Sequence, residues 1–445
     1  MLRTYRFRAW RLAAVCAVVL GASPGARASS AAQADAVEAE GALARWWNGN
    51  GLTAPDEGPF GFLREHGVVF GGTYYGAVFG IQESEGGAAT PYDQGAELNL
   101  DTMPARLLGL PALEGLVLTV EGRWRAELPS DDPNTYVQAS AAFAPSNWGS
   151  GVGWRFLQAN ASYGRRLDAR PDTEVWLKGG WVQPRYEFLL QPSSEKFLNT
   201  AVASAKGLGA NIPFSSSFST WGGMGRVSTP DAYAKAGMFM AYPEATASDN
   251  HGQQFGGSPP HNSVMSLAEI GATPSLRGRP GSPAALPGKY VVGGYLYDNA
   301  DGATTSGGSA NFGLQGGVYL QADQLVYREP DGAGDVPARP QGLVAFGVLM
   351  WAPPRNDDLQ LYFHAGLDWT GAVPTRNLDS IVASFAYGNW SRSTHTETIV
   401  VEGGYQVALN RWLELYPYLQ YDIRPDGTSK VANAFIIGCG TGVTF

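Results

Sequence analysis

Residues 116–128 read LVLTVEGRWRAEL, and from Val120 onward apolar residues or glycine alternate one by one with charged residues. Leucine, valine and tryptophan occupy one face, and the other face carries Glu121, Arg123, Arg125 and Glu127. A period of two residues indicates a β-strand, because successive side chains of a strand point to opposite faces of a sheet. The segment therefore predicts a strand with one face in apolar and one face in polar surroundings.

The same alternation recurs along the chain. Residues 359–369 (LQLYFHAGLDW) and 413–424 (LELYPYLQYDIR) show it most clearly, and 317–323 and 397–409 repeat it. The polar faces of the two clearest segments carry Tyr362, His364, Asp368, Tyr418, Gln420 and Asp422. Segments of this length match a tilted membrane-crossing strand of about 9–11 residues better than an average globular strand of about 5–6. Aromatic residues near the segment ends are typical of the girdles of membrane barrels.

The chain closes with a further alternating segment, residues 435–445, which ends in Phe445. A terminal Phe behind alternating apolar residues resembles the assembly signal of bacterial outer-membrane barrels. No apolar run approaches 18 residues, so a closed barrel is the remaining way to span a membrane. We therefore predict an all-β fold, a closed antiparallel transmembrane β-barrel of about 16 strands over residues 67–445.

Composition agrees with a large β-protein and excludes other classes. Only 16% of the 445 residues are charged, against about 25% in typical soluble domains. The formal net charge of −9 argues against nucleic-acid binding, which needs a surplus of Lys and Arg for the phosphates. The 13 Trp, 20 Tyr and 19 Phe supply too much apolar surface for a disordered chain.

The first 28 residues have the features of a secretory signal peptide. Four arginines within residues 1–11 precede an apolar run at 12–22, and the sequence Ala26-Arg27-Ala28 follows. The run is too short for a transmembrane helix, which needs about 20 residues. We expect cleavage after Ala28, with Ala34 as the alternative site. Cys439 is then the only cysteine, so the mature chain forms no intrachain disulfide.

Three further segments depart from the strand pattern. Residues 29–66 contain an Ala/Glu-rich stretch with helical spacing, and we expect them to form a short N-terminal periplasmic helical segment. Residues 190–220 are long enough to fold into the lumen as a constriction loop, or to form an external flap. Residues 245–287 are rich in Gly, Pro and Ser and predict one or two extracellular loops, with disorder as the alternative.

Several motifs resemble the carbohydrate-selective porins (OprB type) of Gram-negative outer membranes. Trp47-Asn48-Gly49 stands before the first strand, and residues 371–379 (GAVPTRNLD) resemble the family's G-x-x-P-x-R-x-x-D loop. Residues 416–421 (YPYLQY) and 424–427 (RPDG) resemble its penultimate hairpin. The resemblance follows the family's order over most of the mature chain and implies a porin with 16 strands. It also implies passive diffusion of monosaccharides or related polyols into the periplasm. Residues 190–220 depart most from the family, which leaves the solute open.

We expect the polar strand faces to line the pore and contact solute. Sugars present hydroxyl rims and weakly apolar faces, so a wall that replaces water needs charged or amide groups and aromatic rings. The candidates are Glu121, Arg123, Arg125, Glu127, Tyr362, His364, Asp368, Tyr418, Gln420 and Asp422. The plainer interpretation is that they hydrate a wide lumen or pair across strands. Arg376 and Asp379 are expected to form an ion pair that holds a loop.

No feature predicts catalysis, a cofactor or a metal. The motifs HExxH, GxxxxGK[ST] and GxSxG do not occur, and the five histidines do not cluster with cysteine at metal spacing. The expected partners are carbohydrate solutes, outer-membrane lipid and the barrel-assembly machinery through Phe445, with a monomer or a trimer as the assembly. Two alternatives stay open: a general or other small-solute diffusion porin, and a soluble periplasmic or secreted glycan-binding β-protein.

Overall fold

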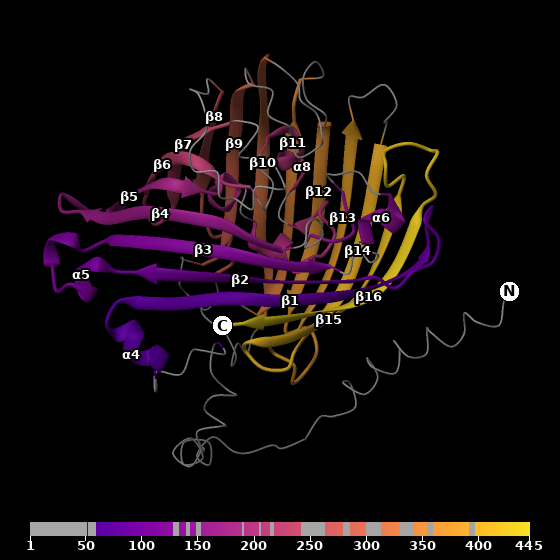
Figure 1. The fold of residues 1–445 in the computed structure, drawn as a ribbon, viewed down its shortest axis with the longest axis horizontal. Helices are drawn as coiled ribbons and strands as arrows, with labels where there is room; N and C mark the ends of the chain where they lie inside the picture. The colour runs from indigo at the N-terminus through magenta and orange to yellow at the C-terminus, as the bar shows by residue number, and fades with distance from the viewer. Residues whose placement is uncertain are drawn as a thin grey trace, which may run out of the picture.

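The computed structural model describes residue 51 and residues 59–127, 133–138, 143–147, 153–188, 191–203, 206–213, 218–241, 263–278, 285–299, 313–329, 341–353, 359–390 and 397–445. Within these residues, 16 antiparallel strands form a closed barrel (Figure 1). Each strand pairs with its neighbours in sequence, and β1 pairs with β16 to close the ring. The predicted fold class is confirmed. The expected signal peptide and residues 29–50 lie outside the described residues.

The strands run β1 Val68–Glu83, β2 Tyr92–Thr102, β3 Leu116–Glu127, β4 Gly153–Leu167, β5 Arg170–Val182, β6 Thr220–Ser228, β7 Ala232–Met240, β8 Val264–Ala272, β9 Gly288–Asn299, β10 Gly313–Arg328, β11 Gly342–Trp351, β12 Leu359–Thr370, β13 Ser380–Trp390, β14 Glu397–Ala408, β15 Leu413–Ile423 and β16 Ala434–Thr444. Short helices lie between or before them: α4 Pro59–Glu65, α5 Pro104–Leu107, η1 Pro111–Leu113, α6 Pro133–Val137, α7 Pro184–Glu187, η2 Pro192–Lys196 and α8 Lys206–Asn211. No helix in the described part of the chain is long and apolar enough to cross a membrane.

The alternation of the sequence separates an apolar outer face from a more polar inner face. In one row of paired residues, Val292, Leu320 and Leu349 of β9, β10 and β11 all point outward and are 60%, 50% and 45% exposed. We call the exposed apolar residues of this kind the outer belt: Leu100, Leu118, Val120, Leu177, Val227, Val292, Leu320, Leu349, Leu367, Leu419 and Ile437. Residues one position away point inward, where Arg123 and Asp368 are buried.

Two connections between strands fold into the barrel. Inner loop A (residues 143–147) belongs to the β3–β4 connection, and inner loop B (residues 183–188, 191–203 and 206–213) belongs to the β5–β6 connection. The Ala144 N–H donates to Thr200 Oγ1 at 2.6 Å, and the Thr200 N–H donates to the Ala144 carbonyl at 2.8 Å, so the loops hold each other. Phe143 packs against Trp390 on β13, with ring centroids 5.6 Å apart. The inner loops thus fill part of the lumen.

One expectation about the loops is wrong. Residues 245–287 were predicted as loop, but the strand β8 occupies Val264–Ala272 in the middle of this range. Its inward positions include Met265 and Leu267, which are buried in the apolar cluster inside the barrel. The inward face here has Glu269 as its one charged residue beside Met265 and Leu267, and the outward face includes Ser266, so the alternation of apolar and polar residues that identifies a strand is weak.

The two ends of the barrel differ. The barrel end at which β1 begins and β16 finishes is called the terminal end. The connections that follow even-numbered strands lie at this end, for example those between β2 and β3 and between β12 and β13. The inner loops enter from the opposite end, which we call the loop end. At the terminal end, Arg376 and Asp379 form the expected ion pair, with Arg376 Nε and Nη2 each 2.8 Å from a carboxylate oxygen. This hydrogen bond raises the pKa of Arg376 and stabilises the β12–β13 turn.

Candidate functional site

A cavity of about 570 Å³ opens between inner loop B and the barrel wall. Its wall comes from the terminal-end halves of β1, β2, β12 and β14 to β16, and its opposite side comes from α7 and η2. The charged residues that line it are Glu97, Arg123, Arg185, Glu195, Lys196, Asp368 and Glu414. Four tyrosines line it as well: Tyr74, Tyr75, Tyr186 and Tyr416. This mixture of charges and tyrosines inside a barrel makes the cavity the candidate site.

A buried ion pair forms one side of the cavity. Arg123 of β3 pairs with Glu97 of β2, and its Nη2 also donates to the Tyr186 hydroxyl at 2.8 Å. The Tyr186 hydroxyl in turn donates to Glu97 Oε2 at 3.1 Å. Burial raises the pKa of Tyr186 well above its usual value of 10, so the phenol keeps the proton that it donates. The three residues therefore join α7 of inner loop B to the barrel wall.

A second ion pair lies across the cavity. Lys196, the last residue of η2, places its Nζ 2.5 Å from Asp368 Oδ2 of β12 and 2.8 Å from Ser380 Oγ of β13. Arg185 of α7 is buried between these sides, and burial lowers its pKa to about 9, which leaves it charged at neutral pH. Cations and anions thus face each other across the space that a solute would occupy.

Inner loop B is clamped to the wall by a buried carboxylate. Glu402 of β14 accepts the backbone N–H of Leu198 and of Asn199, each at 2.8 Å, and the Tyr416 hydroxyl at 3.1 Å. Three donors therefore converge on one buried carboxyl group, and two of them belong to the backbone of inner loop B. Since Leu198 lies two residues from Lys196, the clamp sets the position of the charged end of η2.

Other inward polar residues form hydrogen bonds with the inner loops and do not face an open lumen. Asn199 Nδ2 donates to Gln420 Oε1 and Asp422 Oδ1, both at 3.2 Å. His364 Nε2 lies 2.6 Å from Gln191 Oε1 of inner loop B, and its Nδ1 lies 2.6 Å from the Tyr362 hydroxyl. These β12 and β15 side chains are almost wholly buried and act as anchor points.

The prediction that all ten candidates line the pore therefore needs correction. Tyr362, His364, Tyr418, Gln420 and Asp422 point inward, but the inner loops or the wall cover them, so they do not line the cavity. The physical reason is that the inner loops occupy the space in front of β12 and β15. Of the ten, Arg123 and Asp368 border the cavity.

The remaining three candidates lie on β3. Glu121 accepts a hydrogen bond from Gln158 Nε2 at 2.6 Å, and Arg125 Nη2 lies 3.4 Å from the Asn147 carbonyl of inner loop A. Neither borders the cavity. The side chain of Glu127 lies outside the described residues.

Sequence reasoning missed most of the cavity's charges. Arg185, Glu195 and Lys196 lie on the short helices of inner loop B, where no strand pattern marks an inward position. Glu97 could have been found, because residues 92–102 (YDQGAELNLDT) place Asp93, Glu97, Asn99 and Asp101 on one face of the strand. Among the described residues, no group of His, Cys, Asp and Glu could hold a metal ion.

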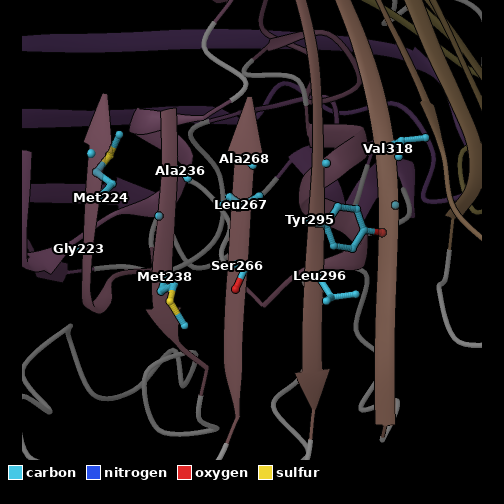
Figure 2. Close-up of a pocket in the computed structure, with 14 residues that line it drawn as sticks. Gly223, Met224, Ala236, Met238, Ser266, Leu267, Ala268, Tyr295, Leu296 and Val318 are labelled. Carbon is cyan, nitrogen blue, oxygen red and sulfur yellow. The ribbon is translucent and has the colours of Figure 1, made fainter. Parts of the chain in front are cut away.

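A second hollow lies on the outside of the barrel across β6 to β10 and measures about 820 Å³. Figure 2 shows small residues on neighbouring strands, among them Ala236, Ser266 and Ala268, beside the larger Met238 and Leu296. Met238 and Leu296 are outward and more than half exposed. None of the described lining residues is charged, so this hollow is part of the outer face and not a polar solute site.

Comparisons with known proteins agree with the geometry. Residues 75–445 match the family model "Carbohydrate-selective porin, OprB family". The chain is similar to the high-pH structure of Pseudomonas putida OprB, with 19% identity and a TM-score of 0.74 over 90% of this chain and 100% of that chain. The low-pH structure of the same protein gives 19% identity and a TM-score of 0.53 over 86% and 95%. No curated protein matches the sequence significantly.

Proposed function

The chain belongs to the OprB family of carbohydrate-selective porins, and from this premise we propose that its sugars pass through the cavity between inner loop B and the barrel wall. The family and the fold make it a carbohydrate porin of the Gram-negative outer membrane. The earlier resemblance to this family is confirmed, and a soluble β-protein is excluded. What is proposed here is the path and the residues that select the solute.

The observation that carries the proposal is the balance of charge in the cavity. Its lining holds three cations (Arg123, Arg185 and Lys196) and four acids (Glu97, Glu195, Asp368 and Glu414). A neutral sugar finds hydrogen-bond donors and acceptors that replace its hydration shell. An ion of either sign meets both attraction and repulsion, and must also lose its own hydration. Binding stays weak, because most of the charges are already paired, and weak binding permits release.

We further propose a constriction, an orientation in the membrane and a purely passive role for the pore. Inner loop B acts as the constriction, because it narrows the barrel and carries Lys196 into the path. The terminal end faces the periplasm, so solute enters at the loop end. The chain performs no catalysis, since a porin only lowers the barrier to diffusion.

The assembly partners remain predictions. Phe445 lies at the barrel seam, where its N–H donates to the Gly72 carbonyl of β1 at 2.8 Å. This place, at the last strand to close the ring, supports recognition of Phe445 by the barrel-assembly machinery. We retain both monomer and trimer as the assembly.

Liposome swelling with purified protein tests the path. The solutes are glucose, a disaccharide, an amino acid and a dicarboxylate, and the variant is Lys196→Gln, which removes the charge and leaves a polar side chain one atom shorter. We expect fast glucose swelling in the native porin and, in Lys196→Gln, an altered ratio of dicarboxylate to glucose swelling. Arg424→Gln is the matched control, because Arg424 pairs with Glu397 at the loop end, outside the cavity.

The outcomes separate the proposal from its main rival. Rates that depend only on solute size in both proteins would reduce the molecule to a general diffusion porin. If Lys196→Gln and Arg424→Gln changed the swelling ratio equally, the sugars would not pass through this cavity.

A further inference from the structure

We propose that α4, α5 and η1 form an interfacial foot (residues 59–66 and 104–114) that inserts into the headgroup boundary of the glycerophospholipid leaflet at the terminal end. The foot would anchor the barrel to lipid beyond the ends of its strands. Residues 59–66 were expected to belong to a periplasmic helical segment, so the proposal places them at the membrane surface instead.

Exposed apolar side chains cover the foot. Six of them are large and lie in two short stretches: Phe60, Phe62, Leu63, Leu107, Leu108 and Leu110. Phe62 and Leu108 are exposed by 59% and 62%. A water-soluble surface rarely concentrates apolar residues in this way, and a contiguous apolar patch usually marks a surface with a partner.

The two stretches form one surface. The Met103 N–H before α5 donates to the Gly67 carbonyl after α4 at 2.7 Å. A Cβ added to Gly67 would lie 2.8 Å from Arg106 Cβ, so the two short helices pack closely at this point. Figure 1 shows α4 and α5 beside each other at the same end of the barrel.

The foot continues the outer belt, and this continuity identifies lipid as its partner. The Phe60 ring of α4 packs on Phe70 of β1, with centroids 5.9 Å apart. Phe70 pairs with Leu100 of β2, which pairs with Val120 of β3, and all three point outward. An apolar surface that begins between strands in the membrane and extends past their ends stays in contact with the same lipid.

Charge at the edge of the foot fits a phospholipid headgroup. Arg106 of α5 is exposed beside Leu107 and Leu108. A long basic side chain can keep its aliphatic stem on the apolar surface while its guanidinium reaches lipid phosphate. Glu65 and Glu114 are exposed as well and lie in the sequence just before β1 and β3.

Depth-dependent fluorescence quenching tests the foot. A bimane label is attached to Leu108→Cys in a Cys439→Ala background, and the protein is placed in vesicles of phosphatidylethanolamine and phosphatidylglycerol. We expect lipid brominated near the headgroup to quench this label about threefold more than it quenches a label at Asp172→Cys, an exposed polar position at the same end. Lipid brominated near the methyl end should quench it less. Arg106→Gln should reduce the quenching in anionic vesicles more than in vesicles of phosphatidylcholine.

Two results would overturn the proposal. Quenching by aqueous iodide equal to that at Asp172→Cys would place the foot in water. Shielding from both iodide and brominated lipid would show that a second copy or another protein covers it. Heat-modifiable gel mobility verifies that each variant has folded, and Leu110→Cys replaces Leu108→Cys if that variant fails to fold.

Discussion

At the scale of single residues, one carboxylate controls the shape of the pore. Glu402 is fully buried and receives the backbone amides of Leu198 and Asn199 together with the Tyr416 hydroxyl. A buried hydrogen-bonding group that loses its partner costs about 1–3 kcal/mol. Because both amides belong to inner loop B, this free energy holds the loop against the wall rather than the strands against each other.

Replacing Glu402 with Gln tests this clamp. The amide keeps one oxygen acceptor and replaces the other with an NH2 group, which cannot accept a backbone N–H, so we expect inner loop B to loosen and the constriction to widen. The measured result should be an increase of several-fold in the swelling rate with a disaccharide relative to glucose, as expected for the loss of roughly 1–2 kcal/mol of local stabilisation. Ser384→Ala is the control, because the Ser384 hydroxyl donates to the Glu402 backbone carbonyl, at 3.5 Å, and the substitution leaves the Glu402 carboxyl in place. An unchanged ratio in Glu402→Gln would mean that other contacts set the loop.

At the scale of elements, inner loop A is held by its fit to β13. Gly388 faces Phe143, and a Cβ added there would lie 2.4 Å from Phe143 Cε2 and 2.6 Å from Cζ. The close approach exists because glycine leaves room for the ring. Phe143 also packs on Tyr362, with centroids 5.7 Å apart, so the same contact links inner loop A to β12.

Gly388→Ala should therefore push Phe143 away from β13 and destabilise the protein by about 1–3 kcal/mol, the usual cost of overpacking. Gly403→Ala on β14 is the matched control. Its added Cβ would meet only the Val382 carbonyl oxygen, at 3.6 Å, which is an ordinary contact. Thermal unfolding in detergent measures both variants, and equal midpoints would show that Phe143 does not determine the fit.

At the scale of the whole molecule, the outer belt determines in which medium the protein stays folded and dispersed. Leu320 lies in the middle of β10 between Val292 and Leu349, and all three are exposed on the outer face of the barrel. Water-soluble surfaces avoid so continuous an apolar band. We therefore expect the purified barrel to aggregate when detergent is removed.

Leu320→Arg should destabilise the barrel in phospholipid vesicles by about 2–4 kcal/mol, the cost of arginine near the bilayer midplane. Leu276→Arg is the control, since Leu276 is 64% exposed but lies between β8 and β9, outside the strands. Guanidinium unfolding followed by tryptophan fluorescence compares the two. A similar small effect at both positions would argue that the belt does not contact lipid.

The local pattern of the chain determined the barrel, the approximate strand number and the inward parity of β3, β12 and β15. Successive side chains of a strand point to opposite faces, so the face of a residue depends only on its position in the strand. The sequence therefore shows a period of two wherever the two faces meet different surroundings. This pattern failed at β8, where the inward residues Met265 and Leu267 are apolar and Glu269 is the one charged residue of that face. The family and its carbohydrate solutes were also recognisable from short motifs such as residues 416–421.

Only the tertiary structure decided which inward residues line the cavity. His364 and Gln420 have the parity of pore residues, yet Gln191 and Asn199, more than 170 positions earlier in the chain, cover them. Arg185 and Lys196 have no strand parity, yet they line the path. The physical reason is that exposure inside a barrel depends on what folds in from the opposite wall, and contacts between such distant residues leave no local period in the sequence.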